Sequence, residues 1–296
     1  MANKVTKAVI PAAGFGTRFL PQTKAMPKEM LPIVDKPVIQ LVAESLVEAG
    51  IKDIIIVTGY HKRSIEDHFD SPSRDLTENL KMGGESKRHL LDEVERISEM
   101  ANFIYVRQKG PYGNGVPLLN VKDLIGDEPF IYTWSDDYIE AAPSEFRQLI
   151  DAYETYNCSI LASIRLKKDN DYDKYGIAGG KEISKGLIDV DTIIEKPGKA
   201  KAPSNLGNVS SFLFTPSIFN YLDEVLANLK AGQELYYNDA LKLMMKAGER
   251  VLAKEIEGGI YYDTGNVLGY LKAVIDAALK HKNINSEFRK FLKSKI

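Results

Sequence analysis

The sequence predicts an α/β fold with a Rossmann-like, mostly parallel central sheet flanked by helices and a helical C-terminal tail at about 265–296. Two observations support this prediction. Short apolar runs alternate with amphipathic stretches through the first half of the chain, and the run 53–58 (DIIIVT) is almost entirely apolar. Parallel strands covered on both faces typically show such runs. We expect one domain spanning 1–296, because no internal repeat or low-complexity linker divides the chain.

The expected elements begin with a strand at 7–11 (KAVIP) and a helix at 37–50. Apolar residues recur at helical spacing in that helix, where Pro37 suits the first position and Gly50 suits the C-terminal end. Near the end of the chain, Gly258-Gly259 predicts a hairpin within 254–263. The other expected strands are 53–58, 103–107, 130–134, 159–166, 187–194 and 208–215, and the other expected helices are 86–100, 217–229, 235–247 and 267–281.

Composition excludes several classes of protein. The chain has 296 residues, 44% of them hydrophobic and 27% charged, which is typical of a globular protein. Its 39 basic and 41 acidic residues give a net charge of −2, so nucleic acid is not an expected partner. Cys158 is the single cysteine, which favours a reducing compartment. The sequence shows no secretory signal and no apolar run of membrane-spanning length, so we expect a cytoplasmic enzyme with no membrane partner.

A glycine-rich turn, 12–18 (AAGFGTR), follows the first strand, and Lys28 lies ten residues further on. Small residues allow the backbone to approach a phosphate, Arg18 offers two donors, and Lys28 adds a point charge. The dinucleotide fingerprint fails at Phe19, and no GxxxxGK[ST] run is present. From the residues alone, a phosphate site and an ordinary turn between strand and helix both remain open.

Acidic residues close two distant apolar runs. Asp136 and Asp137 follow 130–134 (FIYTW), and Asp263 ends 260–263 (IYYD). Magnesium prefers one or two carboxylates together with phosphate oxygens. Asp is also common in turns, and the residues alone favour that alternative.

A further charged pair, Glu195-Lys196, follows the expected strand 187–194. Its carboxylate suits sugar hydroxyls and its ammonium suits a sugar phosphate. The residues alone favour a solvated strand end.

The run 11–37, PAAGFGTRFLPQTKAMPKEMLPIVDKP, resembles the signature of bacterial UTP–glucose-1-phosphate uridylyltransferases, a branch of the sugar-nucleotidyltransferase superfamily. This resemblance implies that UTP and glucose 1-phosphate are the substrates, that Mg²⁺ is the cofactor, and that UDP-glucose and pyrophosphate are the products. It also implies a homo-oligomer. Later matches extend over nearly the whole chain: 90–94 (LLDEV), 126–129 (GDEP), 195–197 (EKP), 202–206 (APSNL) and 263–266 (DTGN).

The resemblance also implies roles for individual residues. Asp137 is an alternative to Asp136 as a metal ligand, while Trp134 and Tyr175 are expected to pack rather than bind. The implied contacts are Ala12, Ala13, Gly14, Gln108 and Gly113 with the nucleotide, Arg18 and Lys28 with its phosphates, Gly176, Glu195 and Lys196 with the sugar phosphate, and Asp136 and Asp263 with magnesium.

Two segments depart from the family pattern. Near the sugar, 210–212 (SSF) replaces the family's Gly-Arg-Tyr/Phe. In 108–118 (QKGPYGNGVPL), Val116 and Pro117 replace the family's usual His and Ala. These changes bear on fine substrate specificity more than on reaction type. Two alternatives to uridylyl transfer stay open. One is thymidylyl transfer to glucose 1-phosphate, and the other is a non-catalytic regulatory relative that binds nucleotide sugars.

Overall fold

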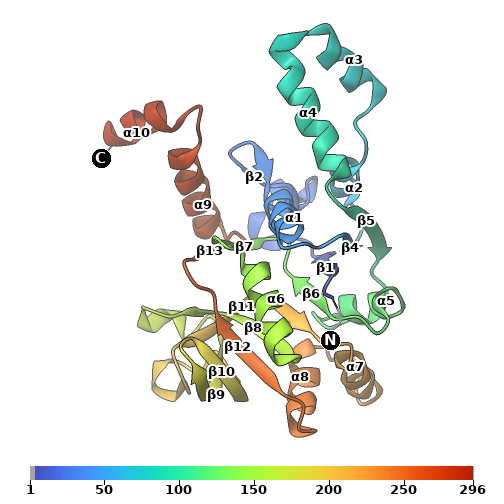
Figure 1. Ribbon diagram of the computed structural model, residues 1–296, viewed down its shortest axis with the longest axis vertical. Helices are drawn as coiled ribbons and strands as arrows, with labels where there is room; N and C mark the ends of the chain where they lie inside the picture. Colours follow the sequence, from blue (N-terminus) through green and yellow to red (C-terminus); the bar gives the residue numbers. More distant parts are fainter. Residues whose placement is uncertain (1–3, 296) are drawn as a thin grey trace.

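A nine-stranded sheet forms the centre of the computed structural model, in the order β5-β4-β1-β6-β11-β8-β12-β10-β9. The structure describes residues 4–295, apart from the side chain of Ser210. Figure 1 shows the sheet running through the molecule with helices on both sides. The strands are β1 (Lys7–Ala12), β4 (Asp53–Thr58), β5 (Asn102–Arg107), β6 (Phe130–Thr133), β8 (Ser159–Arg165), β9 (Gly176–Ser184), β10 (Leu187–Glu195), β11 (Leu206–Phe214) and β12 (Val251–Glu255).

The first four strands of that order, β5, β4, β1 and β6, are parallel. In β4, Ile54 and Ile56 pack in the same buried cluster as α1 (Val38–Glu48). The alternate residues Ile55 and Val57 pack in a second cluster with α5 (Val116–Ile125). Burial on both faces explains why this strand is apolar throughout. The carboxyl ends of these strands share one edge of the sheet.

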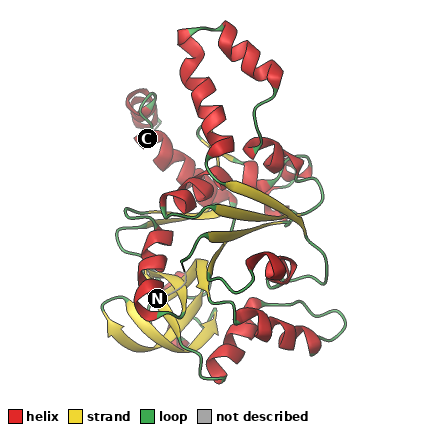
Figure 2. Cartoon of the chain, turned by 45° about the vertical axis from the view of Figure 1, so that its right-hand side comes forward, coloured by secondary structure: helices red, strands yellow, loops and turns green. Residues whose placement is uncertain are grey.

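The remainder of the sheet is mixed. β11 runs antiparallel to β6 and β8, and β10 runs antiparallel to β12 and β9. The start of β11, at Gly207 and Asn208, also pairs with the start of β9. Strands β8, β12, β10, β9 and β11 therefore form a closed ring, visible below the parallel strands in Figure 2. The expected α/β fold is confirmed.

The expected strands are found to within a few residues, but the hairpin prediction at 254–263 is wrong. β12 pairs with β8 and β10, whereas β13 (Ile260–Asp263) pairs with β7 (Asp137–Glu140). The prediction of Pro37 inside a helix is also wrong, because Pro37 lies in the short strand β3 (Lys36–Pro37), which pairs with β2 (Pro32–Ile33). Gly50 follows the end of α1 with a positive φ of 98°, as expected of a residue that closes a helix.

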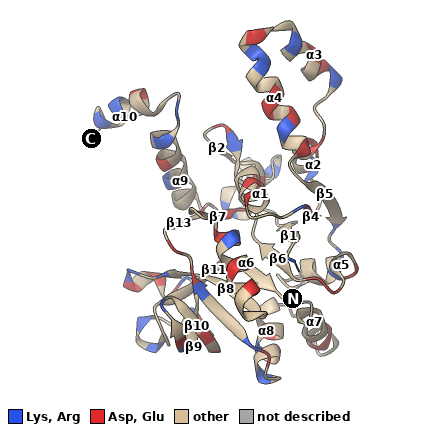
Figure 3. Cartoon of the chain, in the orientation of Figure 1, with Lys and Arg blue, Asp and Glu red and all other residues tan. Residues whose placement is uncertain are grey.

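Two helical arms extend from the body in Figure 1. One is formed by α3 (Arg74–Met82) and α4 (Glu85–Glu99), and the other by α9 (Val267–Lys280) and α10 (Asn285–Lys293), which confirms the helical tail. Both signs of charge are interspersed along α3 and α4 (Figure 3). No helix in residues 4–295 is long and apolar enough to cross a membrane. The remaining helices are α2 (Arg63–Phe69), α6 (Glu145–Tyr156), α7 (Ile218–Ala227) and α8 (Tyr237–Lys246), with single 3-10 turns η1 (Thr17–Phe19), η2 (Gln22–Lys24), η3 (Lys28–Met30), η4 (Asp169–Asp171) and η5 (Lys199–Lys201).

Candidate functional site

The glycine-rich turn lies at the carboxyl end of β1, where open α/β sheets bind their ligands. It borders a cavity of about 460 Å³, which we call the turn cavity. Its walls come from the turn after β1, the loop after β4 and the segment between β5 and α5. Four of the five residues predicted to contact the nucleotide line it: Ala13, Gly14, Gln108 and Gly113. The fifth, Ala12, is the last residue of β1 and is buried in the core.

A second cavity, of about 400 Å³, lies beside the turn cavity. We call it the acidic cavity because Asp136, Asp137, Glu195 and Asp263 all line it, together with Arg18 and Gly176. Gly176, at the start of β9, lies opposite Glu195, at the end of β10. A Cβ on Gly176 would lie 2.8 Å from Glu195 Oε1, so glycine leaves room for this carboxylate. Asn238 fixes the same oxygen by donating a 2.5 Å hydrogen bond from Nδ2.

Lys28, Trp134 and Asp136 line both cavities and therefore form the wall between them. Lys28 Nζ lies 2.7 Å from Asp136 Oδ2. Burial acts to lower the pKa of Lys28, but the Asp136 and Glu29 carboxylates outweigh this effect and raise the pKa above its ordinary value. Lys28 is thus held as a cation at the point where ligands in the two cavities would meet.

Asp136 and Asp263 come from separate elements and converge on Gly265. A Cβ on Gly265 would lie 2.6 Å from Asp136 Oδ2 and 3.2 Å from Asp263 Oδ1. Arg18 Nη2 is 3.5 Å from the same point. The β7–β13 pairing, in which Asp137 is opposite Asp263, accounts for this convergence of residues 127 positions apart in sequence.

The convergent pair fits a magnesium ion that also binds phosphate oxygens, because such an ion needs only one or two carboxylates from the protein. Within residues 4–295 no group of three or more His, Cys, Asp or Glu side chains could hold a metal ion. Burial, followed by the charges of Asp136 and Asp263, raises the pKa of Asp137 well above its ordinary value.

Lys196, like Ala12, is a predicted site residue that does not border either cavity. It follows β10 with a positive φ of 47°, its side chain is exposed, and it lines neither cavity. Its backbone N–H donates to Tyr175 O at 3.1 Å. In this structure, therefore, the ammonium is not directed into the acidic cavity, although Glu195 beside it is.

Sequence reasoning missed several residues that line the cavities, among them Trp134, Tyr175 and Asn238. Trp134 packs against the core as expected, but its half-buried side chain also forms part of the shared wall. Tyr175 lines the acidic cavity, and its ring packs edge-on against Tyr261 at 6.0 Å. Asn238 lies in α8 and also lines that cavity. The sequence around Asn238 shows only a helical pattern, whereas the position of Trp134 directly before Ser135-Asp136 was a usable signal.

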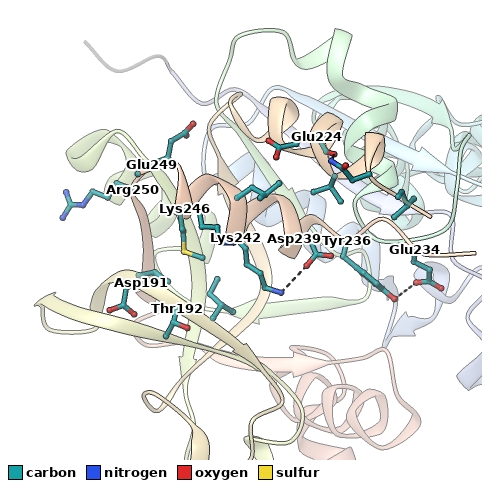
Figure 4. Close-up of a pocket in the computed structure, with 18 of the residues that line it drawn as sticks. Asp191, Thr192, Glu224, Glu234, Tyr236, Asp239, Lys242, Lys246, Glu249 and Arg250 are labelled. Atoms are coloured by element: carbon teal, nitrogen blue, oxygen red, sulfur yellow. Dashed lines mark hydrogen bonds and ion pairs between the residues drawn. The ribbon is translucent and has the colours of Figure 1, made fainter. Parts of the chain in front are cut away.

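A larger cavity, of about 1250 Å³, lies between β10 and helices α7 and α8 (Figure 4). Two local contacts lie in its wall: Lys242 Nζ donates to Asp239 at 3.2 Å, and the Tyr236 hydroxyl donates to Glu234 at 2.7 Å. None of the predicted site residues lines it. Size alone therefore does not identify the functional site of this molecule.

A glycine-rich turn at a parallel sheet edge, facing two cations and two convergent carboxylates, is the type of site found in α/β proteins that bind phosphorylated ligands. The profile of the nucleotidyl transferase family matches residues 7–279. The chain therefore belongs to the nucleotidyl transferase family.

Individual relatives define the branch of this family. The chain is 44% identical to a UTP–glucose-1-phosphate uridylyltransferase of Bacillus subtilis over 98% of this chain and 97% of the relative. It is 42% identical to the Staphylococcus epidermidis protein of the same name over 98% of each. These relatives confirm the resemblance to bacterial UTP–glucose-1-phosphate uridylyltransferases.

Solved structures show the same likeness. A UDP-glucose pyrophosphorylase complexed with UDP-glucose has a TM-score of 0.82 and 38% identity, with 94% of this chain and 100% of the other covered. A UTP-bound enzyme from Acinetobacter baumannii has a TM-score of 0.87 and 33% identity, with 98% of this chain and 99% of the other covered.

Proposed function

We propose that this protein transfers a uridylyl group from UTP to glucose 1-phosphate, forming UDP-glucose and pyrophosphate. The observation that carries the proposal is the junction of two cavities at Lys28 and Asp136. The turn cavity would take the nucleotide, and the acidic cavity would take the sugar phosphate. The names of the relatives, and of the UTP- and UDP-glucose-bound structures, support this assignment.

The proposed reaction is a direct in-line displacement. A phosphate oxygen of glucose 1-phosphate attacks the α-phosphorus of UTP, a new P–O bond forms, and the bond to the departing pyrophosphate breaks. Because the attacking oxygen is already anionic, the reaction needs no Ser or Cys nucleophile and no strong general base. The main obstacle is repulsion between two anions. Arg18 and Lys28 reduce it by holding the phosphates in line and balancing their charge.

The remaining residues have positioning roles. Ala13, Gly14, Gln108 and Gly113 would surround the nucleotide in the turn cavity, and Ala12 would act through the backbone of the turn that it begins. Gly176 and Glu195 would bind the sugar hydroxyls. Lys196 is the proposed partner of the sugar phosphate, and its exposed side chain would have to turn toward the acidic cavity when that ligand binds.

Asp136 and Asp263 would hold Mg²⁺, which neutralises phosphate charge when bound. Asp136 Oδ2 accepts from Lys28 in this structure. The proposal also includes a cytoplasmic location and a homo-oligomer. Exposed apolar side chains along α9 support contact between subunits: Val267, Leu268, Leu271 and Ile275.

Thymidylyl transfer is the second candidate function. Pro117 replaces the family's usual Ala and lines the turn cavity, where the base would lie. Uracil and thymine differ by one methyl group, so a small change in this wall is enough to alter the preference.

The proposal is tested by mixing the purified protein with UTP, glucose 1-phosphate and Mg²⁺, and measuring pyrophosphate release and UDP-glucose formation. Equal amounts of both products are expected, with none when glucose 1-phosphate is omitted. Binding of UDP-glucose without any turnover would instead indicate a regulatory relative.

A further inference from the structure

A buried ion pair includes Glu29, the residue next to Lys28 in the chain. Lys62 Nζ is 2.7 Å from Glu29 Oε2, and the two residues are only 5% and 0% exposed. Removing two charges from water is costly, and such a pair often stabilises a fold no better than apolar residues of similar size. Stability alone is therefore a poor explanation for a pair in this position.

The pair connects two segments that border the turn cavity. Glu29 follows Lys28 in η3, a single turn without the cooperativity of a longer helix. Lys62 lies in the loop after β4, whose residues Gly59 and Tyr60 line the cavity. His61, the residue before Lys62, has a left-handed backbone conformation with φ of 58°, and α2 begins directly after Lys62.

Glu29 has the capacity to bind a second cation. Its Oε1 is buried and has no hydrogen-bond partner among the described residues. Glu29 directly follows Lys28 in η3, and the Lys28 ammonium contacts Asp136.

We propose that Lys62 is a positioning residue: by neutralising Glu29, it keeps the Lys28 ammonium at Asp136, on the wall between the two cavities. Burial raises the pKa of Glu29, and Lys62 opposes this effect. Without Lys62, at a pH high enough to keep Glu29 ionised, its carboxylate would attract Lys28 away from the site. The predicted effect on turnover rests on the proposed function, whereas the predicted location of Lys28 does not.

Crystal structures of two variants test the location. In Lys62→Met, we expect Lys28 Nζ to leave Asp136 and contact Glu29. In Lys62→Met/Glu29→Gln, the competing charge is absent, and we expect Lys28 to contact Asp136 again. The double variant also removes the unpaired buried charge, so it should fold even if the single variant is strongly destabilised. Lys28 remaining at Asp136 in Lys62→Met would overturn the inference whatever the enzyme's substrates are.

Kinetics on folded protein at pH 8 provide the second test. Lys62→Met should lower kcat roughly 10- to 100-fold, as expected when a charge that stabilises the transition state is displaced. Adding Glu29→Gln should restore kcat to within about threefold of the wild type, because isosteric Gln removes the competing charge. A purely structural pair would alter the melting temperature and leave the kcat of folded Lys62→Met normal.

A mutant cycle shows whether the effect passes through Lys28. In a Lys28→Met background, Lys62→Met should change kcat less than about twofold, since no ammonium remains to be displaced. Additive losses would overturn the inference.

Lys7→Met is the control, because it breaks the Lys7–Glu128 ion pair, also 2.7 Å, at the opposite end of β1. That variant should lose stability without losing kcat. A wild-type protein with no turnover would refute the proposed function, but the crystallographic test would still apply.

Discussion

Lys28 Nζ and Asp136 Oδ2 lie 2.7 Å apart in the wall that separates the turn cavity from the acidic cavity. Lys28 lies in the short turn η3, and Asp136 lies just after the buried strand β6, 108 positions away in sequence. The contact places a cation and a carboxylate where the attacking and accepting phosphates would meet. Three predictions test the roles assigned around this contact, a fourth concerns the stability of the fold, and a fifth tests the choice of nucleotide.

The first prediction concerns magnesium. Asp136→Asn and Asp263→Asn should each reduce kcat by roughly 100-fold or more, because each removes half of the proposed carboxylate pair. Both variants should remain folded, since the amide preserves the shape of the side chain. Addition of EDTA should abolish wild-type turnover, and Mg²⁺ should restore it. Near-normal rates in both folded variants at limiting Mg²⁺ would refute this metal site.

The second prediction separates the two lysines by ligand. Lys196→Ala should raise KM for glucose 1-phosphate roughly tenfold and leave UTP binding without sugar unchanged, as measured by calorimetry. Lys28→Met should weaken UTP binding and lower kcat, because Lys28 borders the turn cavity and Lys196 does not. Equal losses of affinity for glucose 1-phosphate and for UTP in Lys196→Ala would contradict this division of roles.

The third prediction concerns the sugar side. In Gly176→Ala, the new methyl group would approach Glu195 Oε1 to 2.8 Å and push the carboxylate out of position. Because the side-chain end moves easily, the melting temperature should change by only a few degrees, while KM for glucose 1-phosphate should rise by roughly tenfold or more. An unchanged KM would show that the placement of Glu195 against Gly176 does not matter for sugar binding.

The fourth prediction is a pH dependence of stability. Glu145, at the start of α6, is only 1% exposed and accepts from Ser211 Oγ at 3.1 Å. Burial raises the pKa of Glu145 from 4.5 to about 8. A raised pKa in the folded state means that stability from the bound proton is complete below pH 4.5 and is lost as pH rises to about 8.

Glu145→Gln removes this loss of stability at higher pH, since the Gln side chain stays neutral. Chemical denaturation at pH 5 and pH 8 gives the free energy of unfolding of the variant and of the wild type. The difference between them should shift in favour of the variant by roughly 2–4 kcal/mol from pH 5 to pH 8. Glu48→Gln, the same change at an exposed position, should show no comparable gain. Parallel pH profiles for Glu145→Gln and wild type would contradict this prediction.

The sequence predicted those parts of the fold that depend on local pattern. The run 53–58 is apolar because both of its faces are buried, and the strand was therefore identifiable without tertiary information. The hairpin at 254–263 failed because β13 pairs with β7, more than a hundred residues earlier in the chain. The glycine pair at 258–259 indicated a turn but carried no information about the partner strand.

The same distinction holds for the site. Arg18, Lys28, Asp136 and Asp263 could be named as candidates because each lies in a short motif that resembles the family pattern, whereas the residues alone left an ordinary turn open. Asn238 was missed because its contact with Glu195 depends on how α8 packs against β10, which no local pattern encodes.

The choice of nucleotide is the most direct test of the proposed function. With glucose 1-phosphate and Mg²⁺, kcat/KM should follow the order UTP, then dTTP, with ATP and GTP far lower. In the proposed site, Gln108 lines the turn cavity and would hydrogen-bond a pyrimidine edge, so a purine would leave polar groups unpaired. One methyl group changes kcat/KM only by roughly 10- to 200-fold. Measuring pyrophosphate release for all four nucleotides decides the matter. A preference for UTP is the predicted result, a preference for dTTP would indicate the thymidylyl alternative, and a preference for ATP or GTP would contradict the assignment to this branch of the family.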